Sequence, residues 1–295
     1  MSKKRLCIAT DTNCCFSKEE IEANELKVLS MEFLIDGKIY KEGIDLTHEE
    51  FYHFLENDVN VSTSQPTPFA LQEFFDEILK EYEEVVYIPM SSGLSKACEN
   101  AIVFAQAYNG KVQVVNNRRI SVTQKASVMM AVKLKEQGKS ACEIKKILED
   151  DQYNSTIYIT METMKYLVKG GRCTPAAAAA GKLLKLKPIL KIYGDKLDKY
   201  EIFNRTIVKA KQTMIEAMKN DFNTKFKEFY DNGEMELYIA HTNNAHQAEI
   251  FKEEVEQAFP GIKINVIDEL SLVVSCHIGP GSLALGSARR IINKK

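Results

Sequence analysis

Short apolar runs alternate with amphipathic stretches along the first half of the chain. The apolar runs have the length of buried strands and occupy residues 6–9, 85–88 and 112–115. The amphipathic stretches have apolar residues near helical spacing and occupy residues 69–79, 97–105 and 127–135. Strands that are separated by helices in this way predict a parallel sheet with helices packed against its faces.

The same alternation restarts near residue 157. Predicted strands occupy residues 157–159, 237–240 and 264–267, and predicted helices occupy residues 176–180, 208–218 and 245–259. Asp36-Gly37 and Gly194-Asp195 stand between apolar segments and predict β-hairpins over residues 34–40 and 188–203. We therefore predict an α/β fold of two α/β domains with largely parallel sheets, residues 1–154 and 155–295. A cleft between two such domains is a common position for a ligand.

Composition and charge narrow the class of protein. The 295 residues include 39 lysines and arginines against 41 aspartates and glutamates, so the net charge of −2 gives no overall attraction to nucleic acid. No apolar run approaches the roughly 18 residues of a membrane span, and the apolar residues after the basic start are too few for a signal peptide. An odd number of cysteines, 7, without a C-x-x-C pair fits a reducing compartment, and we expect a cytoplasmic protein without a metal site.

Two hydroxyl-rich turns share one physical design. Residues 63–68, Thr-Ser-Gln-Pro-Thr-Pro, and residues 91–95, Ser-Ser-Gly-Leu-Ser, both lead into predicted helices. A helix N-terminus presents free backbone N–H groups and partial positive charge, which suit an anion. Serine and threonine are also the preferred N-caps, so one such turn alone is more simply explained as a cap. The two turns together favour an anion site at the carboxyl ends of the strands.

Other motifs are weaker. The chain has no GxxxxGK[ST] phosphate loop and no dinucleotide-binding glycine fingerprint. His277 stands beside the rigid turn Gly279-Pro280-Gly281, where a packed, hydrogen-bonded histidine is a simpler interpretation than a catalytic one. Because no G-x-S-x-G motif accompanies it, a Ser–His–Asp hydrolase has little support.

A basic stretch runs from Lys182 to Lys211. It holds nine lysines and arginines against three acidic residues, in a chain that is slightly acidic overall. A solvated helix or strand face is the simpler interpretation of such a stretch. The sharper interpretation is a docking surface for an acidic partner or an anionic membrane.

Read together and in order, several short segments resemble the DegV family of bacterial lipid-binding proteins. The matching segments, which span most of the chain from Thr63 onward, are residues 63–66, 91–95, 165–172, 186–190, Arg205 after the second hairpin, and 277–281. Residues 9–12, Ala-Thr-Asp-Thr, are similar as well. Each segment is short, but the ordered set is specific.

The resemblance implies a lipid-binding protein rather than an enzyme, with no catalytic residue, metal or cofactor of its own. A long-chain fatty acid would lie in one domain, with its carboxylate near the interdomain cleft. Thr63 and Ser95 would hydrogen-bond the carboxylate, and Arg172 and His277 would lie at or near it. Family members present the acid to a separate fatty acid kinase, which phosphorylates the carboxylate with ATP on the way to phospholipid. A transient contact with an anionic membrane surface is a further expectation.

Two alternatives remain open from the residues themselves. The first is an acyl hydrolase or acyltransferase with Ser95 as nucleophile and His277 as base. The second is a sensor or adaptor that acts through the basic stretch from Lys182 to Lys211.

Overall fold

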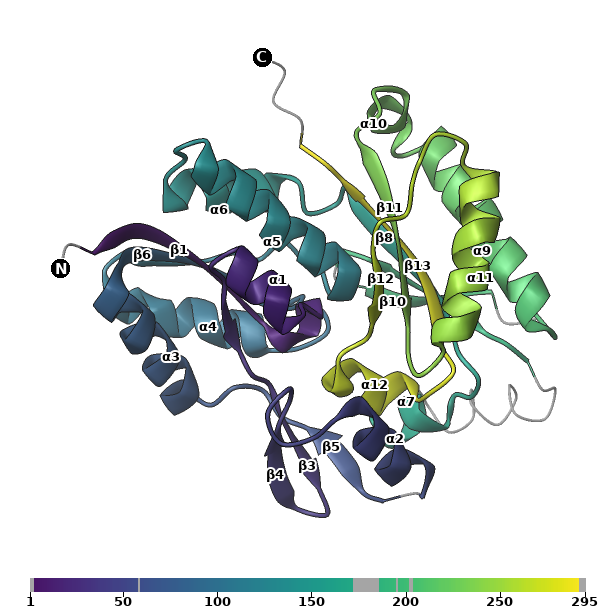
Figure 1. Ribbon diagram of the computed structural model, residues 1–295, viewed down its shortest axis with the longest axis horizontal. Coiled ribbons are helices and arrows are strands. Elements are labelled where there is room, and N and C mark those ends of the chain that lie inside the picture. Colours follow the sequence, from purple (N-terminus) through teal and green to yellow (C-terminus); the bar gives the residue numbers. More distant parts are fainter. Residues whose placement is uncertain (1–2, 58, 172–185, 195, 202–203, 292–295) are drawn as a thin grey trace.

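The computed structural model describes residues 3–57, 59–171, 186–194, 196–201 and 204–291. These residues form an N-terminal α/β unit, a small antiparallel sheet that projects from it, and a C-terminal α/β unit (Figure 1). Among these described residues, no helix is both long and apolar enough to cross a membrane. The division of the chain at 154/155 stays a prediction.

The N-terminal unit is built on a four-stranded parallel sheet in the order β2-β1-β6-β7. Its strands are β1 (Lys4–Asp11), β2 (Lys27–Leu29), β6 (Tyr82–Ile88) and β7 (Val112–Val114). Helices α3 (Pro68–Glu81) and α4 (Ala97–Ala105) pack on one face, and α5 (Ser121–Glu136) and α6 (Ala141–Asp150) pack on the other. Because both faces are covered, each central strand contains an unbroken apolar run, residues 6–9 in β1 and 85–88 in β6, as the sequence predicts.

The hairpin predicted over residues 34–40 is confirmed. Strands β3 (Glu32–Ile35) and β4 (Lys38–Lys41) are antiparallel, and β5 (Val61–Thr63) pairs with the other edge of β3. Asp36 and Gly37 have φ angles of +48° and +80°, which is the backbone of a two-residue hairpin turn and explains the glycine. Helix α2 (His48–Glu56) covers this small sheet, and the strand β5 ends at Thr63.

The C-terminal unit has a six-stranded sheet in the order β10-β9-β8-β13-β11-β12. Its strands are β8 (Ser155–Thr160), β9 (Ile189–Tyr193), β10 (Lys196–Glu201), β11 (Met235–His241), β12 (Ile267–Glu269) and β13 (Leu283–Arg289). β11 and β12 are parallel, and the other neighbouring pairs are antiparallel.

The prediction of largely parallel sheets is therefore wrong for this second sheet. One reason is that the hairpin predicted over residues 188–203 forms as β9 and β10, and strands joined by a tight turn must be antiparallel. The second reason is β13, which the hydrophobic pattern did not reveal because five of its seven residues are small or polar. It lies between β8 and β11 and is antiparallel to both.

Most predicted elements are present, with shifted ends. The strand expected at 264–267 forms instead at Ile267–Glu269, and the helix expected at 127–135 begins earlier, at Ser121. The helix expected at 176–180 lies outside the described residues. Besides β13, helices α2 and α6 and strands β2 and β5 were not predicted. The other elements that were not predicted are short; they are α1 (Lys18–Ala23), α7 (Lys165–Lys169), α10 (Lys227–Asp231), α12 (Leu272–Ile278), η1 (Thr12–Cys14) and η2 (Gln106–Tyr108).

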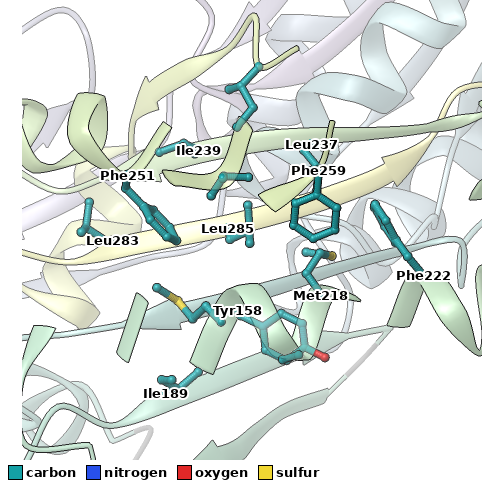
Figure 2. Close-up of a cluster of buried hydrophobic side chains, with 14 of the residues drawn as sticks. Tyr158, Ile189, Met218, Phe222, Leu237, Ile239, Phe251, Phe259, Leu283 and Leu285 are labelled. Carbon is teal, nitrogen blue, oxygen red and sulfur yellow. The ribbon is translucent and has the colours of Figure 1, made fainter. Parts of the chain in front are cut away.

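Helices α9 (Ile207–Asn223) and α11 (Ala245–Ala258) cover one face of the six-stranded sheet. The core between these helices and the sheet is rich in aromatic side chains, and Figure 2 shows Phe222, Phe251 and Phe259 gathered over the strands. Tyr158 of β8 points into this core, so the alternate residues of β8 point to the opposite face. That opposite face, which includes Ile159, lines the candidate site.

Helix α5 lies between the two sheets and contacts both (Figure 1). Val128 and Leu134 pack toward the parallel sheet, whereas Val122 packs toward the six-stranded sheet. A helix that is buried on opposite sides has no single apolar face. This explains why its hydrophobic periodicity was readable only in its second half.

A buried cation on α5 also joins the two units. The Lys125 Nζ atom is 2.8 Å from a Glu20 carboxylate oxygen on α1 and 3.1 Å from Asp268 Oδ1 on β12. The side chain of Lys125 is only 7% exposed, and its ammonium lies over the ring of Phe16. Burial raises the pKa of Asp268 to about 6, although Lys125 opposes this rise. The charge of Lys125 therefore stabilises the two carboxylates, and they in turn stabilise the buried ammonium.

We expect Lys125→Met to lower the free energy of unfolding by about 3 kcal/mol, because it leaves the Asp268 carboxylate buried without its cation. Urea unfolding at pH 8 measures the loss. Lys146→Met is the matched control, since Lys146 pairs with Asp150 on the exposed surface of α6. The control should unfold at nearly the same urea concentration as the unchanged chain, and an equal loss in both variants would contradict the role of Lys125.

Candidate ligand-binding site

A cavity of about 510 Å³ lies between the N-terminal unit and the six-stranded sheet. Its walls come from the two hydroxyl-rich turns, from α12 and from strands β8, β9 and β10. The turns follow β5 and β6, so the cavity lies at the carboxyl end of the parallel strand β6, where ligands of such sheets bind. Its volume is in the range of small-molecule sites.

The floor of the cavity is apolar. Ile159 of β8 is paired with Leu190 of β9, and Ile192 of β9 is paired with Leu197 of β10. Residues that are directly opposite in neighbouring strands share a face, so these four side chains form one continuous apolar surface. Further apolar side chains complete the walls; they are Met31, Met90, Leu94, Ile120, Leu167, Val273, Val274 and Ile278.

The two hydroxyl-rich turns provide the polar part of the lining, which we call the polar end. The first turn provides Thr63, Ser64 and Gln65, and the second provides Ser92, Gly93, Ser95 and Lys96. The Ser95 Oγ atom accepts a hydrogen bond of 3.2 Å from the backbone N–H of Ala97. A hydroxyl that accepts from the backbone keeps its own hydrogen to donate, so Ser95 can donate to an anion in the cavity.

His277 brings a third polar group to this end. Its Nε2 atom is 3.0 Å from the Thr63 Oγ1 atom, although the two residues are 214 positions apart. In the arrangement in which Nε2–H donates to Thr63, the hydroxyl hydrogen of Thr63 is directed away from the imidazole. Thr63 can then donate that hydrogen to a ligand, and the histidine supports the threonine as a donor.

Three of the four residues predicted to bind a ligand can now be placed. Thr63, Ser95 and His277 line the same cavity, and Arg172 lies outside the described residues. The binding role of each stays a prediction. Sequence reasoning missed the apolar floor, because the alternation in the hairpin over 188–203 does not say which face is covered by a helix and which by a ligand.

The basic stretch is partly paired within the structure. Lys211 is buried and forms an ion pair with Glu254, and Lys187 pairs with Glu162. Lys191 lies 3.7 Å from the buried carboxylate of Asp221. Several of the charges from Lys182 to Lys211 are therefore used internally, which weakens the hypothesis of a docking surface along the whole stretch.

Two hydrogen-bonded contacts anchor α12, the helix that carries His277. The Glu42 carboxylate accepts from the backbone N–H of Leu272 and, at 2.6 Å, from Thr12 Oγ1. Ser271 Oγ donates to Asn13 Oδ1 at 3.2 Å. Burial raises the pKa of Glu42 to about 7, against the two hydrogen bonds, which lower it.

The loop that provides Asn13 is in turn held by Asp11. This fully buried carboxylate accepts from the backbone N–H groups of Asn13 and Met90 and from the side-chain amide of Gln124. Burial raises the pKa of Asp11, and the donors around it lower it. Asp11 does not line the cavity, so we interpret its role as structural. Within the described ranges, no group of three or more His, Cys, Asp or Glu side chains is arranged to hold a metal ion.

Fold and site together define an α/β protein with a largely apolar cavity that has hydroxyl and imidazole groups at one end. The chain belongs to the DegV family: the family model described as "Uncharacterised protein, DegV family" matches residues 5–290. The family resemblance inferred from the short motifs is thereby confirmed.

Relatives and solved structures agree with this assignment. A DegV domain-containing protein from Staphylococcus aureus is 30% identical, over 94% of this chain and 96% of the relative. A fatty acid binding DegV family protein from Streptococcus agalactiae has a TM-score of 0.82 at 25% identity, covering 98% of this chain and 100% of that one. A stearic acid-binding protein from Eubacterium ventriosum has a TM-score of 0.84 at 22% identity, covering 96% and 98%.

We expect Glu42 to make the stability of the protein depend on pH. Between its ordinary pKa near 4.5 and its folded pKa of about 7, the folded chain holds a proton that the unfolded chain releases. The free energy of unfolding therefore falls as pH rises through this window, by about 3 kcal/mol at most from this group.

The measurement is urea unfolding from pH 5 to pH 8 for the unchanged chain and for Glu42→Gln. Asp11 and Asp268 contribute a dependence of the same sign, but they are present in both proteins and cancel in the difference. The Glu42→Gln chain should gain stability relative to the unchanged chain as pH rises. Parallel pH profiles for the two proteins would show that Glu42 does not titrate in this range.

Proposed function

We propose that this chain binds a long-chain fatty acid, with the hydrocarbon on the apolar floor and the carboxylate at Thr63 and Ser95. The observation that carries the proposal is the division of one cavity into an apolar floor and a polar end with several donors. Solved relatives of the same fold that are described as fatty acid-binding proteins support it.

The energetics of such a ligand match this division. Burial of a methylene group is worth about 0.8 kcal/mol, so a tail of ~14 methylenes supplies roughly 11 kcal/mol before the entropy losses of binding. Burial of the carboxylate costs free energy unless hydrogen-bond donors of the protein replace the water molecules that solvate it. A charge-assisted hydrogen bond contributes about 1.5–3 kcal/mol, so the hydroxyls of Thr63 and Ser95 offset part of that cost.

We assign supporting roles to the other two predicted residues. In the tautomer with a hydrogen on Nε2, His277 would donate to Thr63 and so direct the threonine hydroxyl toward the carboxylate. Arg172 would add a positive charge near the head group, as the family resemblance implies. Ser95 acts from the opposite turn, so donors from two segments converge on one anion.

We further propose that the chain presents the bound carboxylate to a separate fatty acid kinase, which phosphorylates it with ATP for incorporation into phospholipid. The exposure of the cavity lining supports this. Gln65, Lys96 and Glu99 at the polar end are exposed, whereas Ile159 and Leu190 on the floor are buried. A partner can therefore approach the carboxylate while the hydrocarbon stays covered, and the chain acts as a carrier without turnover.

The enzymatic alternative has less support from the geometry. A hydrolase or acyltransferase with a Ser95 nucleophile needs His277 within hydrogen-bond reach of the serine hydroxyl. The His277 Nε2 atom is directed at Thr63 Oγ1, and Ser95 Oγ is engaged by the backbone of Ala97. This geometry supports a serine that donates to a ligand over a serine–histidine pair.

We expect Thr63→Val with Ser95→Ala to remove the preference of the site for a charged head group. The unchanged chain should bind oleic acid at least about tenfold more tightly than oleyl alcohol, because only the acid forms charge-assisted hydrogen bonds. The double variant should bind the two ligands about equally. Competition with a fluorescent fatty acid measures both affinities.

Ser62→Ala is the matched control for this experiment. Ser62 lies on the same strand as Thr63 and is exposed, and it does not line the cavity. This variant should keep the preference for the acid. A double variant that still discriminates between acid and alcohol would contradict the assignment of the carboxylate to Thr63 and Ser95.

The carrier proposal predicts acyl phosphate formation only in the complete system. Oleic acid, ATP and the fatty acid kinase of the same organism should yield acyl phosphate when the chain is present, trapped with hydroxylamine as the hydroxamate. Omission of the chain, or its replacement by the Thr63→Val, Ser95→Ala variant, should lower the yield at least about tenfold. Turnover of acyl esters by the chain alone, lost in Ser95→Ala, would favour the hydrolase instead.

A further inference from the structure

Helices α7 and α12 each pack an aromatic ring against the glycine that ends the other helix. Each helix is capped by a glycine, Gly170 for α7 and Gly279 for α12. The Tyr166 ring of α7 packs on Gly279, and the His277 ring of α12 packs on Gly170. The two helices lie side by side below the six-stranded sheet in Figure 1.

These contacts leave no room for a side chain at either glycine. A Cβ atom at Gly170 would lie 2.3 Å from His277 Nδ1, and one at Gly279 would lie 2.1 Å from Tyr166 Cδ2. Gly170 has an ordinary right-handed backbone, with φ at −80°. Its backbone therefore does not require glycine, and the space taken by the imidazole is the reason for the residue.

The neighbouring glycine shows that this tightness is specific. A Cβ atom at Gly171 would meet nothing within 4 Å, although its φ of +72° would strain an alanine. The imidazole of His277 is thus held between Gly170 on its Nδ1 side and Thr63 Oγ1 on its Nε2 side. A displacement of the ring toward the cavity would break the geometry that directs the Thr63 hydroxyl.

We propose that Gly170 is a positioning residue for the head group of the ligand. Because Gly170 has no side chain, the His277 ring packs directly on its backbone. This contact holds the imidazole where Nε2 can donate to Thr63. Gly170 acts through His277 and does not itself need to touch the ligand. The expected effect on ligand binding rests on the proposed function. The contact between Gly170 and His277 can be tested without a ligand.

A double-mutant cycle separates this role from a general structural one. We expect Gly170→Ala to weaken binding of oleic acid about tenfold, because the new methyl group displaces the imidazole. In a His277→Ala background the same change should cost less than about twofold, because the removed ring leaves space for the methyl group. Gly171→Ala is the control for backbone strain without a clash, so its effect on affinity should be the same with and without the His277 ring.

Two readouts keep the proposal testable whatever the stability of the variants. In ¹⁵N NMR spectra, the imidazole signals of His277 should shift in Gly170→Ala and stay in place in Gly171→Ala, with no ligand added. If Gly170→Ala does not fold, the His277→Ala, Gly170→Ala chain should fold, since the clash is gone.

The contrary outcomes are distinct. An equal loss of affinity or of folding in both backgrounds, or unchanged His277 signals in Gly170→Ala, would overturn the positioning role. An unchanged chain that binds no fatty acid would overturn the proposed function instead. The NMR comparison would then still decide whether Gly170 holds the imidazole.

Discussion

The hydrogen bond between Thr63 and His277 joins the end of a short strand in the N-terminal part of the chain to a helix near its C-terminus. It forms only if α12 is held at a fixed position against the N-terminal unit. Glu42 and Asn13 hold the start of that helix, and the packing of α7 holds its end. The polar end of the cavity is therefore a consequence of how three separate segments meet.

This arrangement places buried polar groups where they cost stability. Asp11 and Glu42 are buried carboxylates whose pKa values are raised by desolvation, and each is retained by donors from other segments. Buried polar networks of this kind are worthwhile only when every member has a partner. Asp11 accepts hydrogen bonds from the backbone of Met90 and from the side chain of Gln124 on α5. Glu42 accepts from Thr12 and from the backbone of Leu272, so bonds that offset desolvation also fix α12 beside the cavity.

Much of the fold was predictable from local pattern. Strands β1 and β6 are read from their apolar runs, and the Asp36-Gly37 turn specifies its hairpin because both residues tolerate a positive φ. The hydroxyls of Thr63 and Ser95 were predictable as candidate donors, because turns at the carboxyl ends of strands so often bind ligands. These features depend on a few neighbouring residues only.

Other features depend on partners far away in the chain. β13 contains Gly286 and Ser287, which have low strand propensity, and forms because β8 and β11 pair with it on both sides. α12 spans only Leu272–Ile278, so no helical period can be measured. Likewise, Ile192 and Leu197 alternate with polar residues as in any half-buried hairpin. Their exposure to a cavity follows from α12 and the two hydroxyl-rich turns, which form the other walls of that cavity.

The placement of the polar groups around the cavity differs from the placement that an acyl-transfer enzyme needs. An acyl-transfer enzyme needs a nucleophile, a base and an oxyanion site within a few ångströms of one carbonyl. In this chain the hydroxyls face the cavity from opposite turns, and the imidazole is committed to Thr63 by the glycine on its other side. Groups placed in this way suit a carboxylate that already bears its charge, as the proposed function requires. In that proposal, the chemistry belongs to a partner that approaches from the exposed end.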